Sequence, residues 1–328
     1  MLGAVSEPPV QSLVDLCKVL FLKLIYMNRV SNKFVSVIIP VFNDTERLKL
    51  CLSALENQTY PQDCYEVIVV DNNSEENIAA LTKRFERVIL SKESKKGTYA
   101  ARNRGIKIAK GEILGFTDSD CIPTSNWLEN GVDRLLTSSN CGIIAGKIDL
   151  YYQEKNNPNP AEIFDKLVNL QQEKYVEEYH YGATANLFTF KQVFDKIGLF
   201  NAELKSGGDA DWGNRVFAGG YDIIYATDVL VLHPARNSLT QLAKKVIRQT
   251  GGTFDREKKQ KQNLKLSQII NYLIQLRPPV RSAIRKSLAA RELNNILSKI
   301  KLTFIIIIIH YLRISEELRL ELGGESRY

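Results

Sequence analysis

Two carboxylates stand two positions apart directly after an apolar run, in the segment FTDSDCIP (116–123). On an extended backbone the side chains of Asp118 and Asp120 point to the same face, so their charges repel unless a cation or water lies between them. Carboxylates together with substrate phosphates are common ligands of Mg²⁺, and Mn²⁺ accepts the same oxygens. The spacing therefore indicates a divalent cation site. A solvated Asp-Ser-Asp turn is the alternative.

Strands and helices must position this pair. Segments of helical periodicity alternate with four short apolar runs: VSVIIP (35–40), EVIVVD (66–71), RVILS (87–91) and EILGFTD (112–118). This alternation predicts an α/β fold with a mostly parallel sheet and helices on both faces. Asn43 and Glu46 predict a capping box at the first of these helices. Ligands of such sheets bind at the carboxyl ends of the strands, so we expect these ends to line one crevice.

The chain divides into three parts by composition. Residues 1–33 are expected to form an amphipathic helix and not a signal peptide, because charges interrupt the apolar pattern and no cleavage pattern follows. An α/β domain is expected over residues 34–235, in two parts that cover 34–123 and 124–235. Residues 236–328 are expected to form a basic helical tail.

Charge is distributed unevenly along the chain. Residues 1–235 hold 25 basic and 30 acidic groups, whereas residues 236–328 hold 19 basic and 7 acidic groups. Such a tail is expected to meet an anionic surface, either membrane or nucleic acid. Its apolar run LTFIIIIIHYL (302–312) has 11 residues, too few to span a bilayer. It fits a helix in a membrane interface or one buried in an oligomer, and the basic surroundings favour the interface.

The cysteines point to a compartment. Five cysteines form no CxxC pair, which favours a reduced, cytoplasmic setting. Together with the tail, this predicts a cytoplasmic protein that is peripheral at the inner face of the membrane.

Five segments, in order, resemble the motifs of family-two glycosyltransferases: VSVIIPVFND, VIVVDNNS, AARNRGIKIAKGEILGFTDSD, GGDADWGNRVFAGGY and VLVLH. Each is weak alone, but their order and spacing are specific. The resemblance implies a GT-A type, Rossmann-like fold. It also implies metal-assisted transfer of a hexose, with inversion, from a UDP-, GDP- or dTDP-sugar to an acceptor hydroxyl, with Mg²⁺ or Mn²⁺ as cofactor. The basic tail favours a glycan or lipid-linked acceptor, as in envelope polysaccharide or glycolipid biosynthesis.

The resemblance also assigns a donor site. Asp118 and Asp120 would approach the cation and the sugar nucleotide, and His233 would complete the cation site unless it is purely structural. Asp71 would hydrogen-bond the nucleotide base, which is compatible with an Asx turn at the same residue. Phe42 stands where the family often has a tyrosine whose ring stacks on the base; the alternative is an ordinary core aromatic.

The acceptor side follows from the GGDADWGNR motif. Asp209 would be the general base that takes the proton of the acceptor hydroxyl, with a helix N-cap as the alternative. Gly208 departs from the family, which frequently has an acid there. Asp211 and Trp212 are expected to share the work of that missing carboxylate. Asn186 falls in a segment that lies beside donor and acceptor in the family.

Four basic residues lie in and before the helix that precedes the acidic pair: Lys95, Lys96, Arg102 and Arg104. They could neutralise a diphosphate or form a solvated helix face.

Other functions compete with this reading. Gly208 permits a catalytically inactive, nucleotide-binding scaffold of the same fold. A nucleic-acid-binding protein is disfavoured and no nucleic-acid partner is expected, because the basic charge lies in a tail without recognition modules. A processive polysaccharide synthase would carry membrane spans, and no apolar run is long enough for one.

Overall fold

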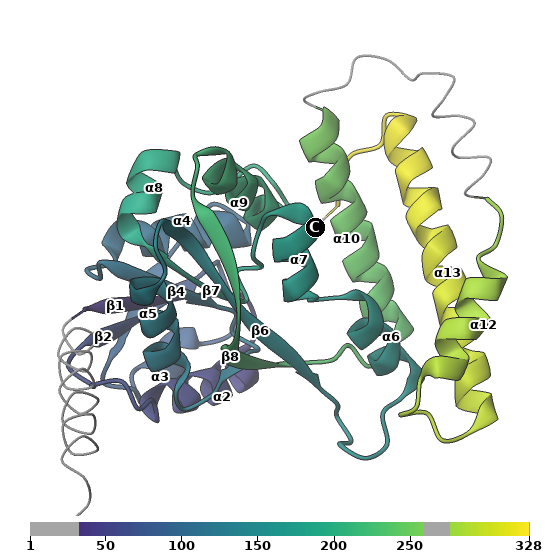
Figure 1. Cartoon of the computed structure of the whole chain (residues 1–328), viewed down its shortest axis with the longest axis horizontal. Helices are drawn as coiled ribbons and strands as arrows, with labels where there is room; N and C mark the ends of the chain where they lie inside the picture. The colour runs from purple at the N-terminus through teal and green to yellow at the C-terminus, as the bar shows by residue number, and fades with distance from the viewer. Residues whose placement is uncertain (1–32, 259–275, 328) are drawn as a thin grey trace, which may run out of the picture.

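The computed structural model describes residues 33–258 and 276–327 (Figure 1). The helix that the sequence predicts over residues 1–33 lies, but for its last residue, outside these ranges.

Strands and helices alternate in the first part of the chain, as predicted. They are β1 (Val35–Val41), α2 (Thr45–Glu56), β2 (Tyr65–Asp71), α3 (Ile78–Thr82), β3 (Val88–Lys92), α4 (Thr98–Ile108) and β4 (Ile113–Thr117). Every residue of β1, β2 and β4 is buried, which explains why their sequences are apolar without alternation. Along β1, Val37 and Ile39 face one hydrophobic cluster while Ile38 faces another, so the sheet has a packed core on each side.

The second part adds shorter strands and more helices. They are β5 (Ile122–Pro123), α5 (Trp127–Thr137), β6 (Cys141–Tyr151), α6 (Pro160–Val168), α7 (Gln172–Tyr179), β7 (Asn186–Phe190), α8 (Lys191–Ile197), α9 (Gly208–Ala218) and β8 (Asp222–Pro234). All the strands join one sheet in the order β3-β2-β1-β4-β7-β6-β8-β5. The first four strands in this order are parallel, as predicted. β7 is antiparallel to both of its neighbours, so the second part is a mixed sheet.

The capping box predicted at the first helix is wrong. The N-cap of α2 is Asp44, whose side chain makes no capping bond, and the backbone N–H of Thr45 donates instead to Oε2 of Glu76 at 2.7 Å. Asn43 instead has a positive φ of 48°, and its Oδ1 accepts a hydrogen bond of 2.7 Å from the backbone N–H of Glu75. Asn43 therefore joins the loops that follow β1 and β2 at the carboxyl edge of the sheet.

In the described residues, three helices follow β8: α10 (Leu239–Lys258), α12 (Val280–Ala289) and α13 (Ile296–Glu321). Leu242 of α10 and both Leu302 and Ile309 of α13 share a hydrophobic cluster with α6. This cluster holds the C-terminal helices against the rest of the fold, and of the three, α10 lies nearest to α7 and α9 (Figure 1).

The apolar run 302–312 lies within α13. Leu302 and Ile309 are buried in this chain, whereas Phe304 and Ile308 are exposed. The run is thus partly in the core of this chain and partly on its surface. Neither a helix in a membrane interface nor a helix buried in an oligomer describes it in full. Among the described residues, no helix combines the length and the apolar character that crossing a membrane requires.

Candidate active site

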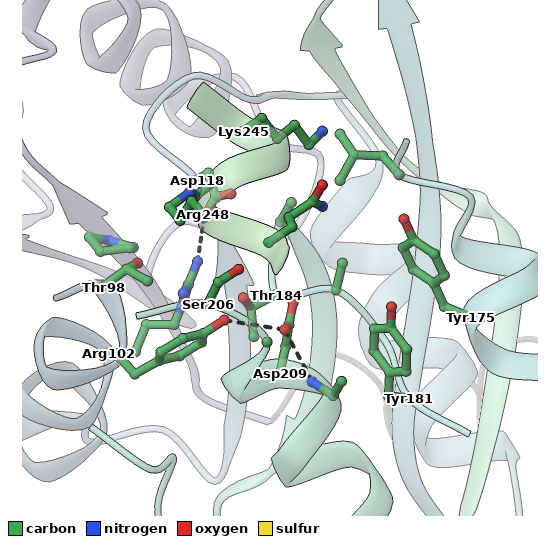
Figure 2. Close-up of a pocket in the computed structure, with 18 of the residues that line it drawn as sticks. Thr98, Arg102, Asp118, Tyr175, Tyr181, Thr184, Ser206, Asp209, Lys245 and Arg248 are labelled. Atoms are coloured by element: carbon green, nitrogen blue, oxygen red, sulfur yellow. Dashed lines mark hydrogen bonds and ion pairs between the residues drawn. The ribbon is translucent and has the colours of Figure 1, made fainter. Parts of the chain in front are cut away.

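A cavity of about 410 Å³ opens where the parallel strands end (Figure 2). Four residues that the sequence singled out line it together: Asp118, Asp120, Asp209 and His233. They come from the loop after β4, from the first turn of α9 and from the end of β8. Residues separated by more than 100 positions therefore meet in one cavity, at the edge of the sheet where the parallel strands end.

Asp120 and His233 are placed to share a cation. The Oδ2 of Asp120 lies 3.6 Å from the Nε2 of His233, and two ligand atoms each about 2.1 Å from one ion can be at most about 4.2 Å apart. The Nδ1 of His233 lies 2.8 Å from the backbone oxygen of Pro234. Because a carbonyl only accepts, Nδ1 must carry a proton, so Nε2 is the ring nitrogen that can bind an ion beside Asp120. The donor set therefore fits Mg²⁺ or Mn²⁺.

Cys121 lies in the same cluster, since ligand atoms of Asp120, Cys121 and His233 are all within 4.8 Å of one another. Burial, followed by the charges of Asp120 and Asp118, raises the pKa of the Cys121 thiol well above its usual value. A protonated thiol is a poor ligand for a hard cation, so we give Cys121 a packing role.

Asp118 is held separately from Asp120. Its Oδ1 accepts a hydrogen bond of 2.5 Å from the Nη2 of Arg102, which is only 3% exposed. Of the four basic residues named above, Arg102 alone lines this cavity. The Nε of Arg102 is buried without a hydrogen-bond partner, so the guanidinium retains bonding capacity.

Arg47 is a site residue that the sequence did not reveal. Its guanidinium donates to Oδ1 of Asp44 at 2.7 Å and lies 3.5 Å from Oδ2 of Asp120. Ser119 donates to the other oxygen of Asp44 at 3.1 Å. The start of α2 thus supports the acidic loop, which a local motif could not indicate because Arg47 and Asp120 are far apart in sequence.

Asp209 faces the cavity from the first turn of α9. Its Oδ1 accepts hydrogen bonds from the hydroxyl of Tyr99 at 3.2 Å and from the backbone N–H of Ala210 at 3.1 Å. The N-cap of α9 is Gly207, so the N-cap alternative for Asp209 is wrong. Within the described residues nothing bonds to Oδ2 of Asp209, which is available to a substrate hydroxyl.

Tyr99 also explains the glycine that departs from the family pattern. A Cβ on Gly208 would lie 2.8 Å from three atoms of the Tyr99 ring, closer than packed atoms approach. The ring of Tyr99 therefore occupies the space that a side chain at position 208 would need. The position of the missing acid is filled by an aromatic ring whose hydroxyl binds Asp209.

This crowding makes a stability prediction. We expect Gly208→Ala to lower the free energy of unfolding by about 1–3 kcal/mol, because an inserted methyl group must displace the ring. Chemical denaturation measures the effect, and a double-mutant cycle with Tyr99→Ala is the control. The cost of Gly208→Ala should shrink once the ring is gone; an equal cost in both backgrounds contradicts the contact.

Two acceptor-side predictions on α9 are wrong. Trp212 is fully buried, stacks on Phe194 with ring centroids 4.2 Å apart, and donates from Nε1 to the backbone oxygen of Gly198. Asp211 forms an ion pair of 3.2 Å with Arg215. Neither residue lines the cavity. Asp211, two positions after Asp209, lies on another face of the helix, and packing against Phe194 holds Trp212 in the core.

The prediction for Asn186 is also wrong. Asn186 is fully buried, and its Oδ1 accepts from Nε1 of Trp127 at 2.8 Å. Its Nδ2 donates to the backbone oxygens of Lys147 and Val229, each at 2.8 Å. These bonds occupy the side-chain amide and fix the strands around it, so Asn186 does not contact an acceptor.

The base-binding residues lie beside the cavity and do not line it. Phe42 is 57% exposed, so it is no core residue and its ring is accessible for stacking. Asp71 is buried, and its Oδ1 accepts from the backbone N–H of Ser74 at 2.9 Å, which is the Asx turn that the sequence allows. Their contact with a nucleotide base stays a prediction.

Helix α10 supplies a wall of the cavity that the sequence reading assigned to a separate tail. Five of its residues line the cavity at intervals of one to four positions: Lys245, Arg248, Gln249, Thr253 and Arg256. Figure 2 shows Lys245 and Arg248 extending from this helix near Asp118. The sequence shows the spacing that places these side chains on one face of a helix, but it does not show which surface that face covers.

Lys245 is held in a buried charge cluster. Its Nζ lies 3.5 Å from Oδ1 of the fully buried Asp165, whose Oδ2 accepts a bond of 3.0 Å from the backbone N–H of Arg236. Burial, followed by the charge of Arg236, lowers the pKa of Lys245 to about 7 although Asp165 opposes this. The positive charges of Arg236 and Arg248 outweigh the single carboxylate.

This cluster predicts a pH dependence of stability. The pKa of Lys245 is about 7 in the folded chain and about 10.4 when unfolded, so between these values the unfolded chain binds more protons and this contribution to stability rises with pH. In Lys245→Met the rise in the free energy of unfolding from pH 7 to pH 9 should be smaller. Urea denaturation at both pH values measures it, and equal rises in the two proteins would refute the shift.

The parallel half-sheet, the acidic residues at its carboxyl edge and the carboxylate facing them define a glycosyltransferase of the GT-A type. The family model described as "Glycosyl transferase family 2" matches residues 36–202, and the chain belongs to this family.

Comparisons with individual proteins agree. The chain is 38% identical over 208 residues to glycosyltransferase AglE of Haloferax volcanii, which covers 62% of this chain and 67% of the relative. It is 25% identical over 228 residues to a dolichyl N-acetyl-alpha-D-glucosaminyl phosphate 3-beta-D-2,3-diacetamido-2,3-dideoxy-beta-D-glucuronosyltransferase of Methanococcus voltae, covering 65% and 71%. The fold is that of the mannosyltransferase PcManGT of Pyrobaculum calidifontis, solved with GDP-Man and Mn²⁺ (TM-score 0.60, 18% identity, 89% and 88% of the chains). The predicted family, fold class and enzyme class are thus confirmed.

Proposed function

We propose that this enzyme transfers a hexose from a nucleotide-sugar donor to a hydroxyl of a glycan or lipid-linked acceptor, with inversion at the anomeric carbon. The observation that carries the proposal is the placement of Asp209 in one cavity with Asp118, Asp120 and His233. UDP-, GDP- and dTDP-sugars all fit this chemistry. The GDP-Man bound by the structural neighbour makes GDP-sugars the first to test.

Inversion requires a single displacement. The acceptor hydroxyl attacks the anomeric carbon from the face opposite the nucleoside diphosphate, the new C–O bond forms as the bond to the diphosphate breaks, and Oδ2 of Asp209 takes the hydroxyl proton. No covalent intermediate and no protein nucleophile are needed. The walls of the cavity contribute by holding donor and acceptor in line.

Asp120 and His233 would hold the Mg²⁺ or Mn²⁺, which when bound stabilises the negative charge of the leaving diphosphate. Asp118 and its partner Arg102 lie on the same wall, where the guanidinium offers a further donor to phosphate oxygens. The oxygen and imidazole donor set supports a hard divalent cation, and the Mn²⁺ in the neighbouring structure is consistent with it.

A thermal-shift panel tests this proposal. Nucleoside diphosphates and their sugar conjugates are added with and without Mn²⁺. One nucleotide should raise the melting temperature and need the cation to do so, because selective binding to the folded state stabilises it. Failure of every nucleotide to shift the protein would sink the proposal.

We further propose the division into a catalytic domain over 34–235, with its nucleotide-binding half (34–123) and acceptor half (124–235), and a tail over 236–328. The tail is then not independent of the site, since α10 lines the cavity.

A peripheral membrane contact at the inner, cytoplasmic face is part of the proposal. Exposed apolar residues recur every three or four positions on two neighbouring helices: Val280, Ile284 and Leu288 of α12, and Ile296, Ile300, Phe304, Ile308 and Tyr311 of α13. Exposed basic residues accompany them: Arg281, Arg285, Lys301 and Arg313. An apolar stripe with a basic rim suits an anionic bilayer surface. The M. voltae relative, which is named for a dolichyl-linked substrate, is consistent with this placement.

We expect Phe304→Glu to reduce co-sedimentation with phosphatidylglycerol vesicles by about tenfold or more. The change removes an aromatic ring that would insert into the bilayer, and it adds a negative charge that the anionic lipids repel. Ser139→Glu adds the same charge at an exposed position after α5, which is not part of the stripe. It should bind nearly as wild type does. Equal binding by Phe304→Glu and wild type would contradict the contact.

A further inference from the structure

The cleft holds more positive charge than the donor accounts for. A second cavity of about 430 Å³ shares Asp120 and His233 with the first. Seven basic side chains line the two: Arg47, Arg102, Arg236, Lys244, Lys245, Arg248 and Arg256. Five carboxylates offset them: Asp118, Asp120 and Asp209 on the walls, Asp165 beneath, and Asp44, which pairs with Arg47. The divalent cation that accompanies a nucleotide sugar cancels the diphosphate charge, so donor binding leaves the surplus in place.

The surplus is concentrated where the two cavities meet. Arg236, Lys245 and Arg248 line both of them. Lys245 is 7% exposed, and within the described part of the chain its Nζ makes no hydrogen bond of good geometry. The nearest anionic oxygen, Oδ1 of Asp165, lies 3.5 Å away and also accepts a bond of 2.7 Å from Asn169. A buried ammonium held by one distant carboxylate oxygen gains from a ligand oxygen that lies closer.

We propose that Arg236, Lys245 and Arg248 bind a phosphate group of the acceptor, so that the cleft holds two phosphorylated substrates at once. This rests on the proposed transferase function. Phosphate fits better than a carboxylate, because it carries more charge and more acceptor oxygens for an ammonium and two guanidinium forks.

The position of these residues assigns them to the acceptor. On the donor side, Asp118 of the acidic pair already has a basic partner, the guanidinium of Arg102 from the nucleotide-binding half. Arg248 belongs to a helix face that continues to Thr253 and Arg256, and Arg256 lies against Gly207, two residues before the proposed base Asp209. The same wall therefore runs from the phosphate-binding residues to the carboxylate that activates the acceptor.

Calorimetry with the donor site filled tests the proposal. The full-length protein is saturated with Mn²⁺ and the nucleoside diphosphate that it binds, and is then titrated with octyl phosphate, inorganic phosphate and, as a neutral control, octyl glucoside. We expect octyl phosphate to bind alongside the nucleotide. Its affinity should fall at least about tenfold in Lys245→Met and in Arg248→Gln, whereas Arg84→Gln, an exposed change after α3 and outside both cavities, should leave it unchanged. Nucleotide affinity should change by less than about twofold in all three.

The arms of the titration separate the sources of the phosphate. Tighter binding of octyl phosphate than of inorganic phosphate indicates a lipid-linked acceptor, and equal binding indicates a soluble phosphorylated one; both support the subsite. Competition between octyl phosphate and the nucleotide overturns it, since these cations would then serve the donor. Absence of phosphate binding also overturns it. If no nucleotide binds, the proposed function fails by itself, and titration of nucleotide-free protein and variants still decides the phosphate site.

Discussion

Replacing Asp209 by Asn should reduce the rate of sugar transfer by about 10²- to 10⁴-fold, the usual contribution of a general base. The amide keeps the size of the side chain and can still accept from Tyr99, but it cannot take a proton from the acceptor hydroxyl. Donor binding should be unchanged, because within the described residues the hydrogen bonds of Asp209 go to Tyr99 and Ala210 and not to Asp120 or His233. The measurement is kcat with labelled donor, alongside nucleotide affinity.

Asp211→Asn is the matched control. Asp211 lies two residues further along α9, outside the cavity, in a partly exposed pair with Arg215. We expect kcat within about twofold of wild type and at most about 1 kcal/mol of lost stability. Near-normal transfer by Asp209→Asn would place the base elsewhere. A wild-type protein that binds nucleotide but transfers no sugar to any acceptor tested would support the inactive-scaffold alternative.

Asp120→Ala should abolish the cation dependence of nucleotide binding and lower transfer by about 10²- to 10³-fold, comparable to the loss of one group that stabilises developing charge. The variant removes one of the two ligand atoms that lie 3.6 Å apart and leaves His233 as the remaining ligand of the proposed pair. The thermal shift caused by nucleotide should become small and equal with or without Mn²⁺. His233→Gln should weaken the same dependence.

Asp228→Ala is the control for this experiment, since Asp228 is an exposed carboxylate paired with Arg134 and lies outside the cavity. It should keep the full Mn²⁺-dependent shift. If Asp120→Ala keeps the shift and Asp118→Ala loses it, the cation belongs with Asp118 and Arg102, and our assignment of the ligand pair is wrong.

Much of the fold was predictable because it depends on local patterns. β1, β2 and β4 are apolar at nearly every position, which only a strand covered on both faces requires, and the parallel order of the first four strands follows from their alternation with helices. The strand-end argument predicted a crevice beside Asp118 and Asp120, whereas the resemblance to the family assigned Asp209 and His233 to the same site. The mixed order of the second half was not predictable, because antiparallel pairing of β7 depends on partners distant in sequence.

Side-chain direction explains the wrong site residues. Trp212, Asp211 and Asn186 stand in or near the right motifs, but the rotation of α9 turns the first two away from the cavity, and three hydrogen bonds hold the third inside the sheet. The reason for Gly208 could not be read from its neighbours either, since the ring that excludes a side chain there belongs to Tyr99, on a different helix.

By itself, the sequence determined the family, the parallel half of the sheet, the acidic residues at its edge and a basic C-terminal region, because these depend on residue type, spacing and composition. Only the tertiary structure decided where that basic region lies. Apolar packing of α10 and α13 against α6 brings Lys245 and Arg248 over the cavity. Composition reports how much charge a segment carries, whereas the long-range contacts of its apolar face decide which surface that charge covers.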